Sequence, residues 1–455
     1  MAEKLRPVDL WFGGTEEPEW ETGSTDEGTQ EMQKVEPLPR LREQLGTELD
    51  EEEAPPDEEF ELGDDFDESD RTIINMGPQH PSTHGVLRLQ IEMEGELIRR
   101  TKPVIGYLHT GMEKTAETLT FLQGPTNVTR MDYLAPMHNE LCFSLAVENL
   151  LGVEIPERAS AIRLLMTELN RVSSHLVALA TNGMDIGAIS MMIYGFRERE
   201  LILAFFEKTT GLRMNHNYIR PGGVAADLAP GWRADVAEIC DVIPKRLKEY
   251  DDLLRENPIW LARTQGVGMI TAEECLAYSI TGPTLRASGV DWDLRKSMPY
   301  SGIEQFDFEV PLGENGDVYD RYRVRVEEIL QSLKIVEQVA AAMPSGDYRT
   351  ADRKVSPPPR ARIDQSMEAL IHHFKLYTEG PLVPPGETYV AVESPRGELG
   401  CYLVSVGEGN PWRMHTRAPS FYNLQALPIM MADSLVADTI ATIASLDPVM
   451  GDVDR

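Results

Sequence analysis

An acidic segment near the amino terminus limits how much of this chain can enter a folded core. Residues 16–70 hold 23 acidic and 3 basic side chains, and the segment ends in ELDEEEAPPDEEFELGDDFDESD. Charges of one sign at this density repel one another, and too few apolar side chains are present to offset the entropy lost on folding. We therefore predict that residues 1–70 form an extended or disordered arm, which leaves residues 71–455 to fold.

The arm has two interpretations. It can be a solubilising tail, or it can dock on a partner, because Trp11, Phe12 and Trp20 are apolar anchors that a pure spacer would not need. Residues 1–15 are neutral and residues 16–70 carry a charge of −20, so the net charge of −32 leaves −12 for the rest. The folded part is therefore only mildly acidic, and we expect no nucleic-acid partner.

Two hairpins are expected from the pattern of apolar residues. Apolar and polar residues alternate from Leu87 to Met93, the pattern of a half-buried strand, and Glu94-Gly95 supplies a turn into ELIRRTKPVIGYL. Near the carboxyl end, TYVAVESPRGELGCYLVSVG, residues 388–407, predicts a second hairpin that turns at Pro395-Arg396-Gly397.

Helical periodicity dominates from Met131. Gly152 ends the first helix, and Pro156-Glu157 opens a second one. The second helix has an apolar stripe made of Ile162, Leu165, Met166, Leu169, Val172 and Leu176. Further helices are expected over residues 189–209, 231–254, 318–341 and 425–446. The expected class is α+β, a central helical bundle with small β-rich parts at both ends.

The predicted elements divide the folded part into three regions. Residues 71–130 form a β-rich amino-terminal domain that holds a histidine loop, and residues 131–350 form the helical bundle. Residues 351–455 form a carboxyl-terminal region with a hairpin, a helix and the terminal GDVDR. Within the bundle, residues 176–196 are long enough to cross a bilayer, but Asn182, Gly183, Asp185 and Gly187 interrupt them. A buried helix end followed by a loop is the better interpretation.

Cysteine spacing argues against a metal cluster or a redox disulfide. No CxxC pair occurs, and the amino terminus has no signal-peptide pattern. We therefore expect buried thiols of a cytoplasmic protein at Cys142, Cys240, Cys275 and Cys401.

The histidine loop reads NMGPQHPSTHGVLRLQ, residues 75–90. Two histidines four apart can bind zinc on a helix, but Pro81 disfavours a helical His80 and replaces the glutamate of the HExxH pattern. Pro81 instead suits a turn from His80 to Thr83, and Gly85 lets the chain bend into the strand. Such a turn can aim both imidazoles at one point. Taken alone, the pair is compatible with a purely structural turn.

Nine motifs in order along the chain resemble those of one family. They are NMGPQHPSTHGVLRL, YLHTGMEK (107–114), RMDYLAPM (130–137), NRVSSHL (170–176), MDIGA (184–188), FRERE (196–200), YIRPGGV (218–224), ESPRGELG (393–400) and GDVDR (451–455). Together they look like the 49 kDa, or D, subunit of respiratory complex I, the proton-pumping NADH:quinone oxidoreductase. The resemblance covers residues 71–455 and implies a fold like the large subunit of nickel–iron hydrogenases. The absence of CxxC pairs argues against a nickel–iron centre.

The resemblance implies a quinone site. In that family the histidine of the HPSTHG loop and the tyrosine of the RMDY motif hold the quinone headgroup, which here implies His84 and Tyr133. The family's aspartate in MDIGA orients the headgroup histidine, a role that falls on Asp185. His80 either lines the cavity or fixes the turn. The chemistry suits these residues, because quinone reduction needs donors that also supply protons.

The resemblance also implies an electron donor on another subunit. The family's quinone site adjoins a small subunit with a [4Fe–4S] cluster, and Arg130 and His109 match positions near that cluster. Thr110 and Asn215 stand where many relatives have arginine and histidine, so the cluster potential of those relatives does not carry over. The stretch QGVGMI lacks a third glycine at the nucleotide-binding spacing, so NADH would be oxidised elsewhere.

The implied role is that of the quinone-reducing subunit of a large assembly. The chain would bind no cofactor of its own, with quinone as substrate. Its partners would be the small iron–sulfur subunit, other peripheral-arm subunits and a membrane-arm subunit at the quinone entrance. It would lie at the cytoplasmic side of the cell membrane. Two alternatives stay open: the same subunit fed by ferredoxin or another donor, and an inactive scaffold, which would be expected to have lost His84, Tyr133 or Asp185.

Overall fold

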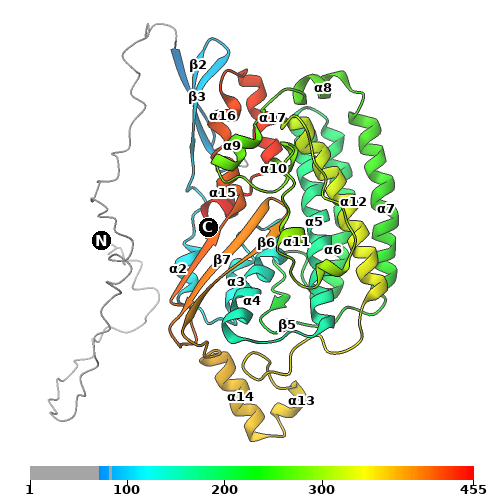
Figure 1. Cartoon of the computed structure of the whole chain (residues 1–455), viewed down its shortest axis with the longest axis vertical. Helices are drawn as coiled ribbons and strands as arrows, with labels where there is room; N and C mark the ends of the chain where they lie inside the picture. Colours follow the sequence, from blue (N-terminus) through cyan, green and yellow to red (C-terminus); the bar gives the residue numbers. More distant parts are fainter. Residues whose placement is uncertain (1–70, 81–82, 84) are drawn as a thin grey trace, which may run out of the picture. The chain divides into compact units, whose positions relative to one another are not determined.

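The structure is a computed structural model that describes residues 71–80, 83 and 85–455, so the predicted acidic arm lies outside the described residues. The described residues combine helices with small antiparallel sheets, which confirms the α+β class (Figure 1). The division of residues 71–455 into three regions stays a prediction.

Two three-stranded antiparallel sheets and a two-stranded ribbon make up the β-structure of the described residues. The first sheet contains β1 (Arg71–Met76), β2 (Arg88–Glu94) and β3 (Leu97–Val104). The ribbon contains β4 (Ile219–Arg220) and β5 (Gly223–Val224). The second three-stranded sheet contains β6 (Gly386–Ser394), β7 (Gly397–Ser405) and β8 (Arg413–Arg417). Both predicted hairpins, β2–β3 and β6–β7, are confirmed. The sequence patterns did not predict β1, in which every residue is exposed or half-buried.

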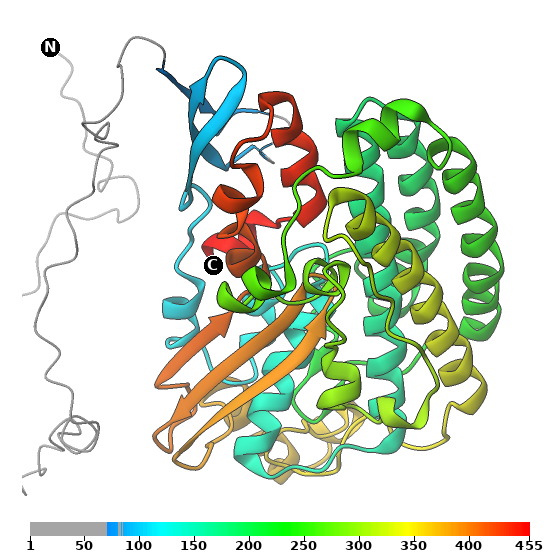
Figure 2. The same ribbon diagram turned by 45° about the horizontal axis from the view of Figure 1, so that its top comes forward.

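Four long helices form a bundle (Figure 1). They are α5 (Glu157–Asp185), α6 (Ile189–Thr210), α7 (Trp232–Leu254) and α12 (Val318–Ala342). A fifth long helix, α4 (Pro136–Leu151), packs against β6 and β7, and Figure 2 shows the orange strands of this sheet beside it. The bundle and sheet share one large apolar core. A second core lies beneath the first sheet and includes side chains of the carboxyl-terminal helices.

Shorter helices connect these layers. They are α2 (Met112–Ala116), α3 (Gly124–Val128), α8 (Pro258–Thr264), α9 (Ala272–Ala277), α10 (Pro283–Ala287), α11 (Leu294–Ser297), η4 (Ile303–Gln305), α13 (Arg360–Ile363), α14 (Met367–Thr378), α15 (Pro419–Leu424), α16 (Leu427–Met431), α17 (Val436–Leu446) and α18 (Met450–Asp454). In particular, α17 contacts α5 and so joins the second core to the bundle.

Several helix boundaries differ from the sequence predictions. The helix expected from Met131 starts at Pro136, because residues 131–135 form turns. The helix expected over 425–446 is broken between α16 and α17, where Asp433 has φ +56°.

The prediction of a helix end followed by a loop within residues 176–196 is confirmed, but the break lies after Asn182 and Gly183 and not at them. Both residues lie inside α5, and the chain turns only at residues 186–188, with Gly187 at φ +102°. Close packing explains the glycine in the helix, since a Cβ at Gly183 would lie 2.7 Å from Cβ of Met191. None of the helices in the described ranges is long and apolar enough to span a bilayer.

Candidate functional site

The histidine loop between β1 and β2 is tied together by Thr83. The buried Thr83 hydroxyl donates to the carbonyl oxygens of Pro78 (3.1 Å) and His80 (3.0 Å). The Thr83 N–H also donates to the carbonyl oxygen of His80 at 3.2 Å, the hydrogen bond expected for a turn from His80 to Thr83. Gly77 leaves no room for a side chain, because a Cβ there would lie 2.1 Å from the Leu87 carbonyl oxygen. His84 lies outside the described residues.

The last helical residue of α5 is Asp185, and His80 acts on it electrostatically. Burial raises the pKa of Asp185 to about 6, and the positive charge of His80 opposes this rise. The structure therefore brings His80 close enough to Asp185 for the two side chains to interact electrostatically. The sequence analysis expected Asp185 to interact with His84. It did not identify His80 as an electrostatic partner of Asp185.

Tyr133 lies in the turns that precede α4, half-buried against the carboxyl-terminal helix α18. A Cβ on Gly451 would lie 3.3 Å from the Tyr133 ring and 2.4 Å from the Met131 carbonyl oxygen, so this position requires glycine. Burial raises the pKa of the Tyr133 phenol, and the positive charge of Arg396 opposes the rise. The phenol therefore stays protonated at neutral pH and can act as a donor.

A buried polar cluster lies beside Tyr133 and centres on Arg396, from the turn between β6 and β7. The guanidinium Nη1 donates to Asp132 Oδ2 (2.8 Å) and Ser174 Oγ (3.0 Å). Nε donates to the carbonyl oxygen of Asp447 (3.0 Å), and Nη2 lies 2.9 Å from Asp447 Oδ2. Asp132 Oδ1 also accepts from the backbone N–H groups of Leu134 and Ala135, so it fixes the turn that holds Tyr133 before α4 begins.

A third carboxyl group, Asp452, lies in the same cluster. Burial raises its pKa to about 6, and the negative charge of Asp132 adds to this rise. Burial also raises the pKa of Asp132, although Arg396 lowers it. Three carboxyl groups thus share Arg396, with Arg325 near Asp447, so carboxyl groups outnumber the guanidinium groups and the cluster can hold a proton near neutral pH.

Hydrogen bonds to Asp454 of the terminal GDVDR motif hold the segment that begins the YLHTGMEK motif. The Asp454 carboxylate accepts from the N–H groups of Gly106 (2.8 Å) and Leu108 (2.7 Å). Nδ1 of His109 lies 2.7 Å from the Asp454 carbonyl oxygen. These contacts hold the exposed His109 next to the chain end.

The segments that contain Arg130 and Asn215 meet at Glu140 of α4. The buried Glu140 carboxylate accepts from the N–H groups of residues 217–219 at 2.6–2.9 Å and from the Thr129 hydroxyl at 2.7 Å. Burial raises the pKa of Glu140 to about 7. Arg130 itself is exposed. Sequence patterns did not single out Glu140, because a glutamate within a helical stretch is usually solvent-facing.

The cysteines do not supply a metal site. All four are buried thiols, as expected, and Cys142 and Cys401 come from α4 and β7, packed against each other. Burial raises the pKa of both thiols, which disfavours the thiolate that a metal needs. In the part of the chain that the structure describes, no three His, Cys, Asp or Glu side chains form a group that could hold a metal ion.

Four of the nine motifs named from the sequence converge around Arg396. RMDY supplies Asp132 and Tyr133, NRVSSHL supplies Ser174, ESPRGELG supplies Arg396 and GDVDR supplies Asp452. The sequence interpretation assigned no role to Arg396, Asp447 or Asp452, although the presence of Arg396 and Asp452 in unusual motifs was a usable signal. The assembled groups offer a phenol donor beside protonatable carboxyls, an arrangement suited to delivering protons to a bound substrate.

Comparison with known proteins gives a consistent family. A family described as "Respiratory-chain NADH dehydrogenase, 49 Kd subunit" matches residues 185–455. The chain is 55% identical over 411 residues to a D-type subunit of NADH-quinone oxidoreductase from Salinispora arenicola, covering 86% of this chain and 93% of the relative. It is 55% identical over 386 residues to a D-type subunit of the same enzyme from Chloroflexus aurantiacus, covering 84% and 94%. It is 54% identical over 404 residues to the corresponding D-type subunit from Mycolicibacterium smegmatis, covering 85% and 91%.

Proposed function

Because this chain belongs to the family of the 49 kDa subunit of respiratory-chain NADH dehydrogenase, we propose that it is the quinone-reducing subunit of complex I. It acts as an oxidoreductase only within the multisubunit NADH-quinone oxidoreductase. Its fold is that of the nickel–iron hydrogenase large subunit without the metal ligands. The chain binds no cofactor of its own, and quinone is its substrate.

The observation that supports this function best is the approach of the histidine loop to the end of α5. His80 acts electrostatically on Asp185, although about one hundred residues separate them in the chain. A loop that served only as a turn would not need an ionisable partner from a distant helix. In our proposal this junction, with Tyr133, encloses the quinone headgroup.

Reduction of a quinone adds two electrons and two protons, one proton to each carbonyl oxygen. The Tyr133 hydroxyl donates to one oxygen and the His84 imidazole to the other, where negative charge gathers as the electrons arrive. Each donor must then regain a proton. The cluster of Asp132, Arg396 and Asp452 lies beside Tyr133 and can resupply it, because the pKa of Asp452 lies near 6.

Asp185 links quinone reduction to events elsewhere in the complex. Its carboxyl group has a pKa of about 6, so a change of charge on a neighbouring histidine shifts its protonation near neutral pH. In our proposal the proton taken from His84 changes that balance, and Asp185 then moves or takes up a proton. This local change triggers proton translocation in the membrane subunits.

The electrons come from a [4Fe–4S] cluster on a neighbouring small subunit, beside the exposed Arg130 and His109. NADH is oxidised on another peripheral-arm subunit, and the quinone arrives by way of a membrane-arm subunit. The chain thus lies at the cytoplasmic side of the membrane as a peripheral part of the complex. Glu140 joins the segments that contain Arg130 and Asn215, and it thereby shapes the surface that faces the iron–sulfur cluster of the neighbouring subunit.

Three single variants of the assembled complex test the proposal. We expect His84→Ala, Tyr133→Phe and Asp185→Asn to leave the complex assembled and to lower quinone reductase activity about 100-fold, since each removes a donor or a charge at the headgroup. Tyr278→Phe is the control, because Tyr278 is a partly exposed tyrosine at the end of α9 and should keep full activity. Near-normal turnover with short-chain quinones in His84→Ala and Tyr133→Phe would refute the assignment.

A further inference from the structure

Helix α14 exposes an apolar stripe to solvent. Five large side chains recur at helical spacing and are 46–67% exposed: Met367, Leu370, Ile371, Phe374 and Tyr377. Among the described side chains of α14, Leu376 alone is buried. A stripe of this kind on one face of an amphipathic helix marks an interaction surface, because burying it against a partner is favourable.

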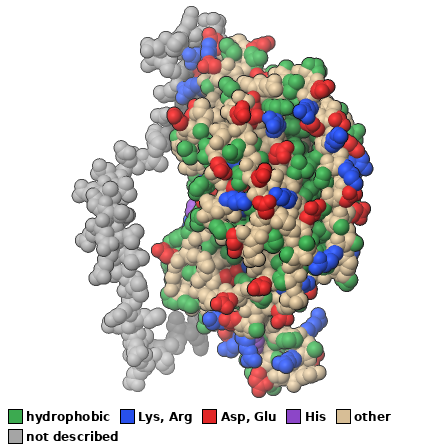
Figure 3. Space-filling view, turned by 45° about the vertical axis from the view of Figure 1, so that its right-hand side comes forward, with side chains coloured by type: hydrophobic (Ala, Val, Ile, Leu, Met, Phe, Trp, Pro, Cys, Tyr) green, Lys and Arg blue, Asp and Glu red, His purple; other side chains and the backbone are tan. Residues whose placement is uncertain are grey.

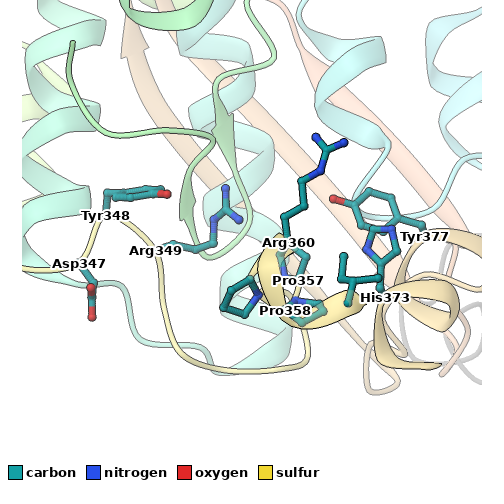
Figure 4. Close-up of a pocket in the computed structure, with 10 residues that line it drawn as sticks. Asp347, Tyr348, Arg349, Pro357, Pro358, Arg360, His373 and Tyr377 are labelled. Atoms are coloured by element: carbon teal, nitrogen blue, oxygen red, sulfur yellow. The ribbon is translucent and has the colours of Figure 1, made fainter. Parts of the chain in front are cut away.

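A pocket of about 700 Å³ opens next to this stripe, and its lining includes two arginines, a histidine and two tyrosines together with one acidic side chain, Asp347 (Figure 4). Arg349 is fixed in place, since its Nη2 donates to the carbonyl oxygen of Ala225 at 2.7 Å. The His373 ring packs on Tyr377 with centroids 4.7 Å apart, and its buried Nδ1 has no hydrogen-bond partner among the described residues. The Arg360 side chain runs past the hydroxyl end of Tyr377 on the same side of the pocket (Figure 4).

The chain around the pocket is basic. Residues 347–364 contain five basic and three acidic side chains, a net positive stretch in a protein whose net charge is −32. Of these acidic side chains, Asp347 lines the pocket and Asp352 lies 3.9 Å from Lys354. Figure 3 shows basic side chains at this end of the described chain. The charges of Glu368 and Lys375 on α14 cancel each other. The preference for an acidic partner therefore comes from the net positive charge of residues 347–364.

We propose that α14 and this pocket bind an acidic amphipathic segment of another hydrophilic subunit of the same complex. Apolar side chains of that segment pack on the stripe, and a carboxylate enters the pocket between Arg349 and Arg360. The inference rests on the proposed function only in that the chain works inside a multisubunit enzyme.

A protein partner fits this surface better than a lipid surface. An interfacial membrane helix carries mainly Lys and Arg along its polar edge, whereas the polar residues of α14 include Glu368. In addition, α14 and the first sheet, β1–β3, lie at opposite ends of the folded chain (Figure 1). The histidine loop connects β1 and β2, so α14 is far from the place where quinone would enter from a bilayer.

Photocrosslinking in the intact complex tests the proposal. Phe374 is 63% exposed, so replacing it by the photoreactive p-benzoylphenylalanine should leave the fold unchanged. After irradiation of membranes that contain the complex, we expect one main adduct to another hydrophilic subunit, at a segment rich in Asp and Glu. Adding Arg360→Glu should lower the adduct yield about tenfold through like-charge repulsion. The same photoreactive residue at Ile259 of α8, which is 66% exposed, should not give this adduct.

Three outcomes would overturn the inference: an adduct with phospholipid, an adduct within this same chain, or a yield that Arg360→Glu leaves unchanged. Failure of this surface is distinguishable from failure of the proposed function. If the complex is assembled and loses activity in His84→Ala and Tyr133→Phe but gives no adduct with another subunit, only the docking site is wrong. If no complex I subunits accompany the chain, the proposed function is wrong as well.

Discussion

Two buried clusters of charged side chains differ in how many cations face each carboxyl group. The bundle cluster contains Glu168, Asp293, Glu328 and Glu393 with Arg171, Arg286, Arg295 and His175. The cluster beside Tyr133 contains Asp132, Asp447 and Asp452 around Arg396. Similar residue types thus form two environments. In the first, each carboxylate contacts an arginine or a histidine, whereas in the second three carboxyl groups share Arg396 and the nearby Arg325.

The pKa values follow this difference. Burial would raise the pKa of Glu328, but Arg286 and His175 outweigh burial and hold the pKa well below its usual range. Arg295 and Arg286 likewise overcome burial and lower the pKa of Asp293 to about 2. Glu393 is the exception, because burial raises its pKa despite Arg286.

Beside Tyr133, burial prevails and the pKa of Asp452 rises to about 6. The bundle cluster therefore holds mainly fixed charges that fasten helices together, whereas the Tyr133 cluster can exchange a proton near neutral pH.

The largest expected effect comes from breaking the bundle cluster. Arg286 contacts Glu328 at 2.6 Å and Glu393 at 2.8 Å, and all three side chains are fully buried. Arg286→Met removes the guanidinium that both carboxylates contact and leaves Glu328 with His175 alone, which should destabilise the subunit by about 3–5 kcal/mol and deplete it from the complex. Quantitative immunoblots of purified membranes measure this loss.

The control for Arg286→Met is Arg255→Met, which breaks an exposed pair with Asp251 at 3.3 Å. Exposed pairs contribute about 0–1 kcal/mol, so this variant should accumulate normally. Normal accumulation of Arg286→Met would show that the bundle cluster is not needed for folding.

Arg396→Met should have a smaller effect that depends on pH. Asp132 and Asp452, whose pKa values are already raised, can take up protons when the cation is lost. We expect a destabilisation of about 3 kcal/mol at pH 8 and about 1–2 kcal/mol less at pH 6. Thermal inactivation of the complex at both pH values gives the comparison. Asp447→Asn in the same chain should recover part of the loss, and equal destabilisation at both pH values would contradict the proton exchange.

Asp452→Asn isolates the carboxyl group with the shifted pKa. A folded pKa of about 6 lies above the ordinary value near 4, so Asp452 stabilises the fold below about pH 4 and this contribution is lost as pH rises through 6. Across this range the wild type should lose roughly 2–3 kcal/mol from this group alone. Asn keeps an acceptor for the Ser420 N–H, which donates to Asp452 at 3.0 Å.

The variant should therefore show a flatter profile of stability against pH between 4 and 7. Thermal midpoints measured at intervals across this range provide the test. Parallel profiles for the wild type and Asp452→Asn would mean that another group carries the titration.

The smallest expected effect comes from His80→Gln. The positive charge of His80 lowers the pKa of Asp185, so removing it should raise that pKa above about 6 and move the acid limb of quinone reductase activity to higher pH. We expect a shift of a few tenths of a pH unit, roughly the scale of a partly solvated charge pair. His415→Gln, which changes an exposed histidine 3.2 Å from Glu113, should leave the limb in place. If the acid limb stays in place in His80→Gln, the charge of His80 does not influence the pKa of Asp185.

Sequence patterns were sufficient for the elements with a clear period and an unambiguous end. Gly152, with φ +63°, ends α4 where expected, and α6 and α7 match their predicted ranges within one residue. The patterns missed the break after α16 because the apolar residues continue across it, while Asp433 takes a left-handed conformation that tertiary contacts support. Local periodicity carries no information on such contacts.

Site prediction had a similar limit. The resemblance named Tyr133 and Asp185, but it assigned no role to the side chains that set their environment. Arg396 joins Asp132 and Asp447, which lie 264 and 51 residues away in the chain, and only the fold brings them together. The placement of His84 stays a prediction.

Photolabelling with a photoreactive quinone tests most directly whether the headgroup lies between the histidine loop, Tyr133 and the end of α5. In the assembled complex we expect adducts in residues 77–87, 130–136 or 184–188 that excess unlabelled quinone suppresses. The pocket lined by Asp347 to Tyr377 provides an internal comparison and should not be labelled competitively. Competed adducts confined to that pocket, or to other subunits, would contradict the site assigned to this chain.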